Sequence, residues 1–71
     1  MVKSEKQKEI LTNRERETLN LIAKGYSTKE ISEILNVSPF TIKTHRQVIL
    51  KKLSSKNCIE AIYRAIKLEL I

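Results

Sequence analysis

The chain contains no aspartate and only one histidine, one cysteine and one glycine among its 71 residues. Without aspartate, a Ser-His-Asp triad could form only if a glutamate took its place. A zinc site needs several Cys or His ligands, and a phosphate-binding loop needs several glycines. A nucleophile and base would have to come from Cys58, His45 and the glutamates, which the expected helices hold apart. An enzyme is therefore the weakest interpretation, and we expect no catalytic residue, metal, cofactor or small-molecule ligand.

Long apolar runs are also absent. No stretch approaches the roughly 18 residues of a membrane span, and the first residues lack the apolar segment of a signal peptide. The single cysteine, Cys58, cannot form a disulfide within the chain, which fits a reducing compartment. We expect a soluble, cytoplasmic protein with no membrane partner.

Acidic residues are missing from the middle of the chain, although its net charge is +6 overall. None occurs between Glu33 and Glu60, and the rest of the chain, with nine basic and eight acidic residues, is nearly neutral. The basic residues in this gap are Lys43, Arg46, Lys51, Lys52 and Lys56. Basic charge concentrated on one element is typical of proteins that bind a polyanion, and it favours nucleic acid as the partner.

The segment from Ser27 to Leu53 is typical of two helices joined by a tight turn. Ser27 and Glu30 form a capping box at the start of the first helix. Asn36 can adopt the left-handed conformation that ends a helix. Ser38 is a second N-cap, followed by proline at the first helical position, where its missing N–H costs nothing. This pattern predicts a helix-turn-helix, whose second helix usually enters the DNA major groove.

A helical projection at about 100° per residue gives this second helix two faces. The residues expected to face inward are Ile42, His45, Ile49 and Leu53. The residues expected to face outward are Phe40, Thr44, Gln47 and Lys51, with Lys43 on the flank. The polar outward side chains suit contacts to base edges and phosphates, although an ordinary solvated face has the same composition. The basic charge of this helix favours the first interpretation.

One further helix is expected on each side of this pair. Thr12 opens the first with a capping box to Glu15, and Gly25 ends it. Alternating charges after Thr12 indicate a solvated first turn. Asn57 caps the last helix, with Glu60 completing a box-like pair. We therefore predict an arm over residues 1–10 and a single domain over residues 11–71.

The last helix carries two apolar faces. One suits packing on the domain and contains Cys58, Ala61, Ile62, Ala65 and Leu68. The other is a stripe at helical spacing and contains Ile59, Tyr63, Ile66 and Leu70. Because a terminal helix in so small a domain can bury only one face, we expect this stripe to mediate dimerisation. The alternative is that the first 11 residues fold over it.

Several motifs, in order and at matching spacing over residues 11 to 70, resemble the DNA-binding domain of LuxR/FixJ-type regulators. They are LTNRERE at 11–17, KGYSTKEI at 24–31, Ser38 with TIKTH at 41–45, KL at 52–53 and EA at 60–61. The resemblance implies an all-α, four-helix domain containing a helix-turn-helix, whose third helix reads the major groove and whose fourth mediates dimerisation. It also implies groove contacts for Lys43, Thr44 and Gln47, and positions near phosphates for Thr41 and His45. A packed, hydrogen-bonded histidine is the alternative for His45.

Three positions differ from the family pattern. Cys58 stands where the family commonly has arginine, and Ser54-Ser55 replaces the usual Gly-Val. Glu69 stands at a usual glycine position, so the last helix is expected to run to the end of the chain. In longer members of the family the domain follows a receiver or ligand-binding domain, so a stand-alone regulator and a part of a larger one both fit.

We predict a sequence-specific, duplex-DNA-binding transcription regulator that acts as a homodimer on a two-fold-related operator. The predicted base-reading residues are Lys43, Thr44 and Gln47. The predicted phosphate contacts are Ser27, Thr28, Lys29, Ser38, Thr41, Arg46, Lys51 and Lys52. The alternative is a sigma-factor-like, promoter-reading domain that acts mainly with RNA polymerase. A protein-interaction module whose basic helix docks on an acidic surface is a further class.

Overall fold

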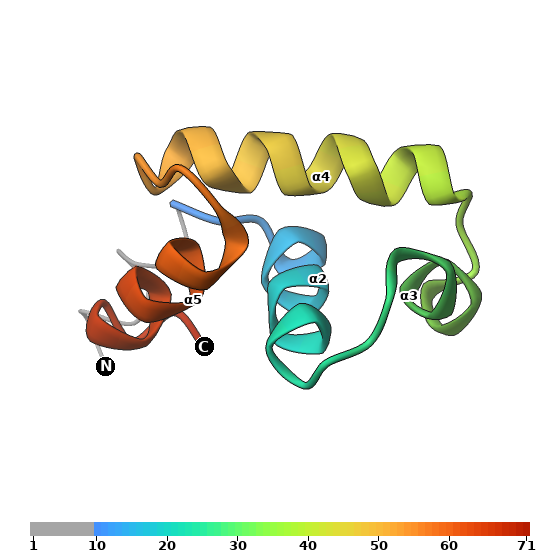
Figure 1. Cartoon of the computed structure of the whole chain (residues 1–71), viewed down its shortest axis with the longest axis horizontal. Helices are drawn as coiled ribbons and strands as arrows, with labels where there is room; N and C mark the ends of the chain where they lie inside the picture. The colour runs from blue at the N-terminus through green and yellow to red at the C-terminus, as the bar shows by residue number, and fades with distance from the viewer. Residues whose placement is uncertain (1–9) are drawn as a thin grey trace.

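The computed structural model describes residues 10–71, which form four α-helices and no strand (Figure 1). The helices are α2 (Asn13–Ala23), α3 (Thr28–Leu35), α4 (Pro39–Lys52) and α5 (Cys58–Lys67). This confirms the all-α, four-helix prediction. Most of the predicted arm, residues 1–9, lies outside the described residues, and Ile10 is half-buried against the core.

Each helix begins at a polar cap that the sequence predicted. The side chains of Thr12, Ser27, Ser38 and Asn57 accept hydrogen bonds from the backbone N–H three residues later. The first two caps are complete capping boxes. The fourth differs, because Glu60 accepts from the N–H of Lys56 at 2.8 Å, one residue before the cap. These bonds satisfy N–H groups that a helix start would otherwise leave unpaired.

Each of these four helices also ends in the same way, at a residue with a positive φ angle. These residues are Gly25 (98°), Asn36 (59°), Ser54 (51°) and Glu69 (60°). The following N–H then bonds to a carbonyl five residues back, as in Leu70 N–H to Ala65 C=O at 2.8 Å. This is the Schellman motif, which pairs the last carbonyls of a helix. The prediction that the last helix runs to the chain end is therefore wrong: α5 ends at Lys67, and Glu69 adopts the left-handed conformation although it is not glycine.

The helix α4 is the element on which the others assemble. Figure 1 shows it lying along one side of the molecule, and it contacts α2, α3 and α5. The buried core contains Leu11, Leu19, Ile49, Leu53, Ala61, Ala65 and Leu70. Ile31 of α3 and Ile42 of α4 are also fully buried. Because one face of α4 supplies core residues along most of its length, its other face remains available to solvent.

Two side chains have an exposure that their residue types do not suggest. Ile34 of α3 is apolar but 51 % exposed, and Ile31 is the fully buried residue of that helix. Glu15 was expected in a solvated turn, but it is only 7 % exposed. Its burial is explained by a partner from α4, Lys52, whose Nζ lies 2.8 Å from Glu15 Oε1.

Candidate nucleic-acid interface

The two faces of α4 have the composition that the helical projection predicted. Ile42, Ile49 and Leu53 are buried, and His45 is half-buried on the same side. The outward residues Phe40, Lys43, Thr44, Gln47 and Lys51 are all exposed. No acidic residue occurs anywhere in α4. The outward face of α4 is thus an exposed polar and basic surface fixed on a helix that the core holds in place.

The three predicted base-reading residues lie together on this surface. Lys43 and Gln47 line a hollow beside α4 that also contains Arg46, Leu50 and Cys58. The hydroxyl of Thr44 donates to the C=O of Phe40 at 3.1 Å, which leaves the oxygen lone pairs of Thr44 able to accept. The ammonium of Lys43 and the amide of Gln47 supply donors, and the amide also supplies an acceptor. Base edges in a major groove offer partners for each of these groups.

Arg46 was predicted as a phosphate contact, and the structure shows it held by two neighbouring helices. Its Nη1 donates to Thr28 Oγ1 at 2.7 Å, and its Nη2 donates to Cys58 Sγ at 3.5 Å. Thr28 is the first residue of α3 and Cys58 is the first residue of α5. The guanidinium therefore joins three helices, and it places positive charge near the N-termini of α3 and α5, where the helix dipoles also attract anions.

The predicted phosphate-binding hydroxyls serve first as caps. Ser27 Oγ accepts from Glu30 N–H, and Ser38 Oγ accepts from Thr41 N–H, each at 3.1 Å. The hydroxyls of Ser38 and Thr41 also lie 3.0 Å apart, within hydrogen-bond distance of each other. These side chains position the starts of α3 and α4. The ammonium groups of Lys29 and Lys43, near these helix starts, are exposed.

Lys52, another predicted phosphate contact, has a partner within the domain. Its ammonium is paired with the buried carboxylate of Glu15. Burial raises the pKa of Glu15, but the hydrogen bonds from Lys52 and Thr12 and the positive charge of Lys52 together lower it below the ordinary value of a glutamate. Lys52 thus ties the end of α4 to the start of α2.

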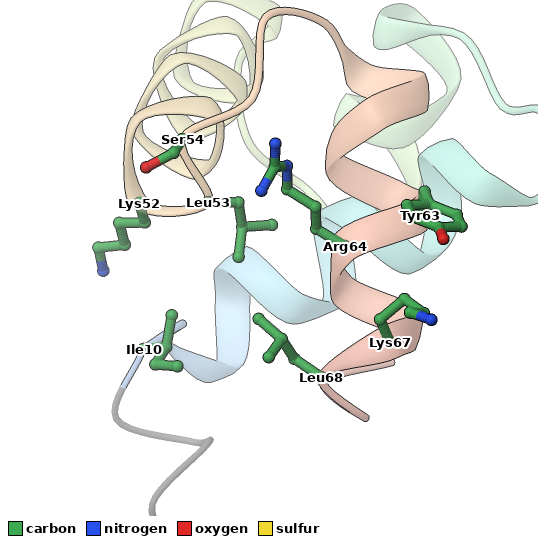
Figure 2. Close-up of a pocket in the computed structure, with 8 residues that line it drawn as sticks. All are labelled: Ile10, Lys52, Leu53, Ser54, Tyr63, Arg64, Lys67 and Leu68. Carbon is green, nitrogen blue, oxygen red and sulfur yellow. The ribbon is translucent and has the colours of Figure 1, made fainter.

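The end of α4 also borders a second hollow, shown in Figure 2. Lys52, Leu53 and Ser54 lie on one side of it, and the other side is formed by Tyr63, Arg64 and Lys67 of α5 and by Leu68 directly after it, with Ile10 at the edge. The guanidinium of Arg64 points toward the end of α4 in this view, and it pairs with Glu60 at 3.0 Å. This hollow contains none of the predicted base-reading residues.

His45 has part of the packed, hydrogen-bonded environment that was one of its two predictions. It is half-buried on the inward side of α4, and its Nδ1 is buried without a hydrogen-bond partner among the described residues. The packed histidine expected from the projection is present, but the hydrogen bond expected with it is not found at Nδ1.

The apolar stripe of α5 is exposed at three of its four predicted positions. Ile59, Tyr63 and Ile66 are 80 %, 61 % and 57 % exposed. Leu70 is only 4 % exposed and belongs to the core. The reason is the positive φ of Glu69, which turns the chain after α5 so that Leu70 points back into the domain. Placing Leu70 on the outward stripe was therefore wrong.

Neither a metal-binding cluster nor a membrane-spanning helix is found within residues 10–71. No group of three or more His, Cys or acidic side chains is arranged to hold a metal ion there. Within the same residues, no helix is both long enough and apolar enough to cross a membrane.

Comparison with known proteins identifies the family. The model of bacterial regulatory proteins of the luxR family matches residues 9–65. The chain belongs to this family. Its members carry a LuxR-type helix-turn-helix DNA-binding domain, which is not an enzyme, and DNA is the partner of that domain.

Three relatives illustrate where the similarity lies. The chain is 47 % identical over 55 residues to the transcriptional regulatory protein DesR of Bacillus subtilis, covering 78 % of this chain and 28 % of DesR. It is 47 % identical over 62 residues to the oxygen regulatory protein NreC of Staphylococcus carnosus, covering 87 % of this chain and 29 % of NreC. It is 48 % identical over 58 residues to the response regulatory protein YgeK of Escherichia coli, covering 82 % of this chain and 40 % of YgeK. The chain therefore spans well under half the length of these relatives.

Proposed function

We propose that this luxR-family chain is a sequence-specific regulator of transcription whose helix α4 enters the major groove of duplex DNA. The observation that carries the proposal is the outward face of α4, which is exposed along its length, contains no acidic residue, and lies on a helix anchored by the core. A major groove about 12 Å wide accommodates one α-helix. Lys43, Thr44 and Gln47 read base edges in this arrangement. Such a protein would act in the cytoplasm, where bacterial DNA lies.

The phosphate contacts in this proposal are fewer than the sequence suggested. Lys51 is exposed on the same face as the base-reading residues, and Lys29 is exposed near the start of α3. The N-termini of α3 and α4, capped by Ser27 and Ser38, offer further positive potential. Arg46 contributes charge near Thr28 without leaving its position. Lys52 is left out, because its ammonium is paired with Glu15.

The same proposal includes a homodimer formed through α5. Ile59, Tyr63 and Ile66 follow one another at one-turn spacing and are largely exposed, so a second copy can bury them. A dimer with two-fold symmetry would place two α4 helices on half-sites about one turn of DNA, roughly 34–36 Å, apart. The three relatives are named as regulatory proteins rather than sigma factors, so we do not retain the sigma-factor alternative.

Selection of binding sites from a random duplex pool at moderate salt tests this function. Wild-type protein should enrich a two-fold-symmetric motif. Gln47→Ala should relax the preference at one position of each half-site, since a good bidentate base contact discriminates by about 1–3 kcal/mol. Lys51→Ala should instead weaken binding to all sequences alike.

Two results would contradict the proposal. One is the absence of any enriched motif, with binding that simply falls as salt rises, which would mean that α4 supplies charge only. The other is an equal loss for Gln47→Ala and Lys51→Ala on selected and on random duplexes, which would remove the distinction between base and phosphate contacts.

A further inference from the structure

The outward face of α4 carries one large apolar side chain that the proposed base and phosphate contacts do not use. Phe40 is 76 % exposed, the highest exposed fraction of any large apolar residue outside α5 within the described residues. It makes no contribution to the core, because the buried side of α4 is formed by Ile42 and Ile49. An exposed phenyl ring forgoes the roughly 1.5–3 kcal/mol that its burial would provide. Its position is therefore better explained by binding than by folding.

The location of Phe40 favours a contact with bases. It is the second residue of α4, and the N-terminal residues of a recognition helix contact base edges. Lys43 and Thr44 lie one turn further along the same face, and the Thr44 hydroxyl donates to the Phe40 carbonyl. The ring is therefore continuous with the base-reading surface, at the end of it that starts the helix.

The chemistry of the major groove then limits what the ring can recognise. Base edges there present hydrogen-bond donors and acceptors, and a single apolar group, the C5 methyl of thymine. A phenyl ring has no conventional donor or acceptor, so the thymine methyl is the group on a base edge that best matches it. Lys43, Thr44 and Gln47 contribute mainly polar groups, and Phe40 supplies the matching apolar contact.

We propose that Phe40 determines specificity by packing its ring on the C5 methyl of a thymine beside the bases read by Lys43, Thr44 and Gln47. This inference rests on the proposed function, because it requires α4 in the major groove. It adds a base to the recognised half-site, and it predicts that this base is chosen by its methyl group alone.

Replacing thymine by uracil tests the inference directly, because it removes the methyl and leaves the base edge otherwise unchanged. Site selection is run with wild-type protein and with Phe40→Ala, in parallel on a thymine pool and on a pool in which uracil replaces thymine. Wild type should enrich one thymine that it does not enrich as uracil, and Phe40→Ala should not enrich it in either pool. Gln47→Ala is the matched control and should keep this thymine while losing a different base.

Affinities for the selected duplex then give the size of the effect. Changing that thymine to uracil in one half-site only should weaken wild-type binding about fourfold, the equivalent of one methyl group removed from an apolar contact. Phe40→Ala should bind both duplexes equally, and Phe40→Leu, which keeps an apolar side chain, should retain part of the preference. Because Phe40 is exposed, Phe40→Ala should melt at the wild-type temperature.

The outcomes separate this inference from the function on which it rests. A motif that wild type and Phe40→Ala enrich identically, or a uracil substitution that affects both proteins equally, would overturn the role of Phe40 and leave a sequence-specific regulator. The absence of any enriched motif with wild type would overturn the proposed function itself, and the Phe40 contact with it.

Discussion

The outward faces of α4 and α5 are equally accessible but opposite in chemistry. On α4 the exposed side chains are polar or basic, apart from Pro39 and Phe40 at its start. On α5 they include an apolar stripe of Ile59, Tyr63 and Ile66. Both helices bury their other face in one core, so neither exposed face is needed to hold the domain together. Exposure alone therefore does not identify an interface, and the chemistry of each face decides its partner.

The two faces follow different physical rules. A polar, basic face gains attraction and released counterions from a polyanion. An apolar stripe gains nothing from phosphates and is stabilised when a second apolar surface removes it from water. We accordingly expect changes on α4 to affect DNA binding without affecting dimerisation, and changes on α5 to affect dimerisation first.

A change in the core that α4 and α5 share should have the largest effect, because it acts on both exposed faces at once. Ile42→Ala removes a fully buried side chain on the inner side of α4 and should cost about 2–5 kcal/mol of unfolding free energy. Urea denaturation measures this cost. Thr44→Ala, on the opposite face of the same helix, is the matched control and should change stability by less than about 0.5 kcal/mol. Equal costs for the two variants would mean that the faces of α4 are wrongly assigned.

The next effect concerns the face of α5 alone. Ile59→Lys places a charge in the apolar stripe and should weaken self-association at least about tenfold, because a buried unpaired charge costs more than about 1.4 kcal/mol. Sedimentation equilibrium measures association, and binding to a single half-site should stay as in wild type. Gln47→Ala should show the reverse, with altered DNA binding and unchanged association. If Ile59→Lys associates like wild type, the stripe is not the dimer contact.

The ion pair between Glu15 and Lys52 should have a smaller effect, and one that depends on pH. The pKa of Glu15 is lowered in the folded chain, so the stabilisation is present above the unfolded value of about 4.3 and is lost as pH falls through the folded value. Glu15→Gln keeps an acceptor for Thr12 N–H but removes the charge, and should cost about 1 kcal/mol at pH 7.

Urea denaturation of both proteins at pH 7 and pH 3 checks this prediction. The gap in stability between wild type and Glu15→Gln should be smaller at pH 3 than at pH 7, because protonation of the carboxyl removes its charge. A gap of the same size at both pH values would show that the charge of Glu15 is not the source of the stabilisation.

The smallest effect is expected at a helix end. Ser54 has a φ of 51°, a conformation that glycine adopts without the crowding caused by a side chain. Ser54→Gly should therefore stabilise the domain by about 0.5–1 kcal/mol, seen as a higher melting temperature. Gly25→Ser, the reverse change at a φ of 98°, should destabilise it. Destabilisation by Ser54→Gly would contradict the strain assigned to Ser54.

The sequence allowed prediction of features that depend on neighbouring residues. The caps at Thr12, Ser27 and Ser38 are built from side chains three residues apart, and their bonds are local. The two faces of α4 follow from helical periodicity alone. These features could be predicted because no distant part of the chain is needed to form them.

The features that sequence reasoning missed depend on distant contacts. Lys52 and Glu15 are 37 residues apart, so their pairing requires the packing of α4 on α2. Arg46 reaches Thr28 and Cys58 only once α3, α4 and α5 are assembled. The inward turn of Leu70 depends on Glu69 adopting a conformation usually taken by glycine. The glycine that the family usually has at this position was the signal for that turn.

The central claim is that the outward face of α4, and not its end at Lys52, contacts DNA. The salt dependence of affinity for the selected duplex tests it most directly, because removing one lysine from a phosphate reduces the slope of log K against log salt by about 0.9. Lys51→Met should reduce the slope by about this amount for each of the two copies bound to the duplex. The charge-neutral double variant Glu15→Gln with Lys52→Met should leave it unchanged. A reduced slope for the double variant, with a wild-type slope for Lys51→Met, would contradict the account.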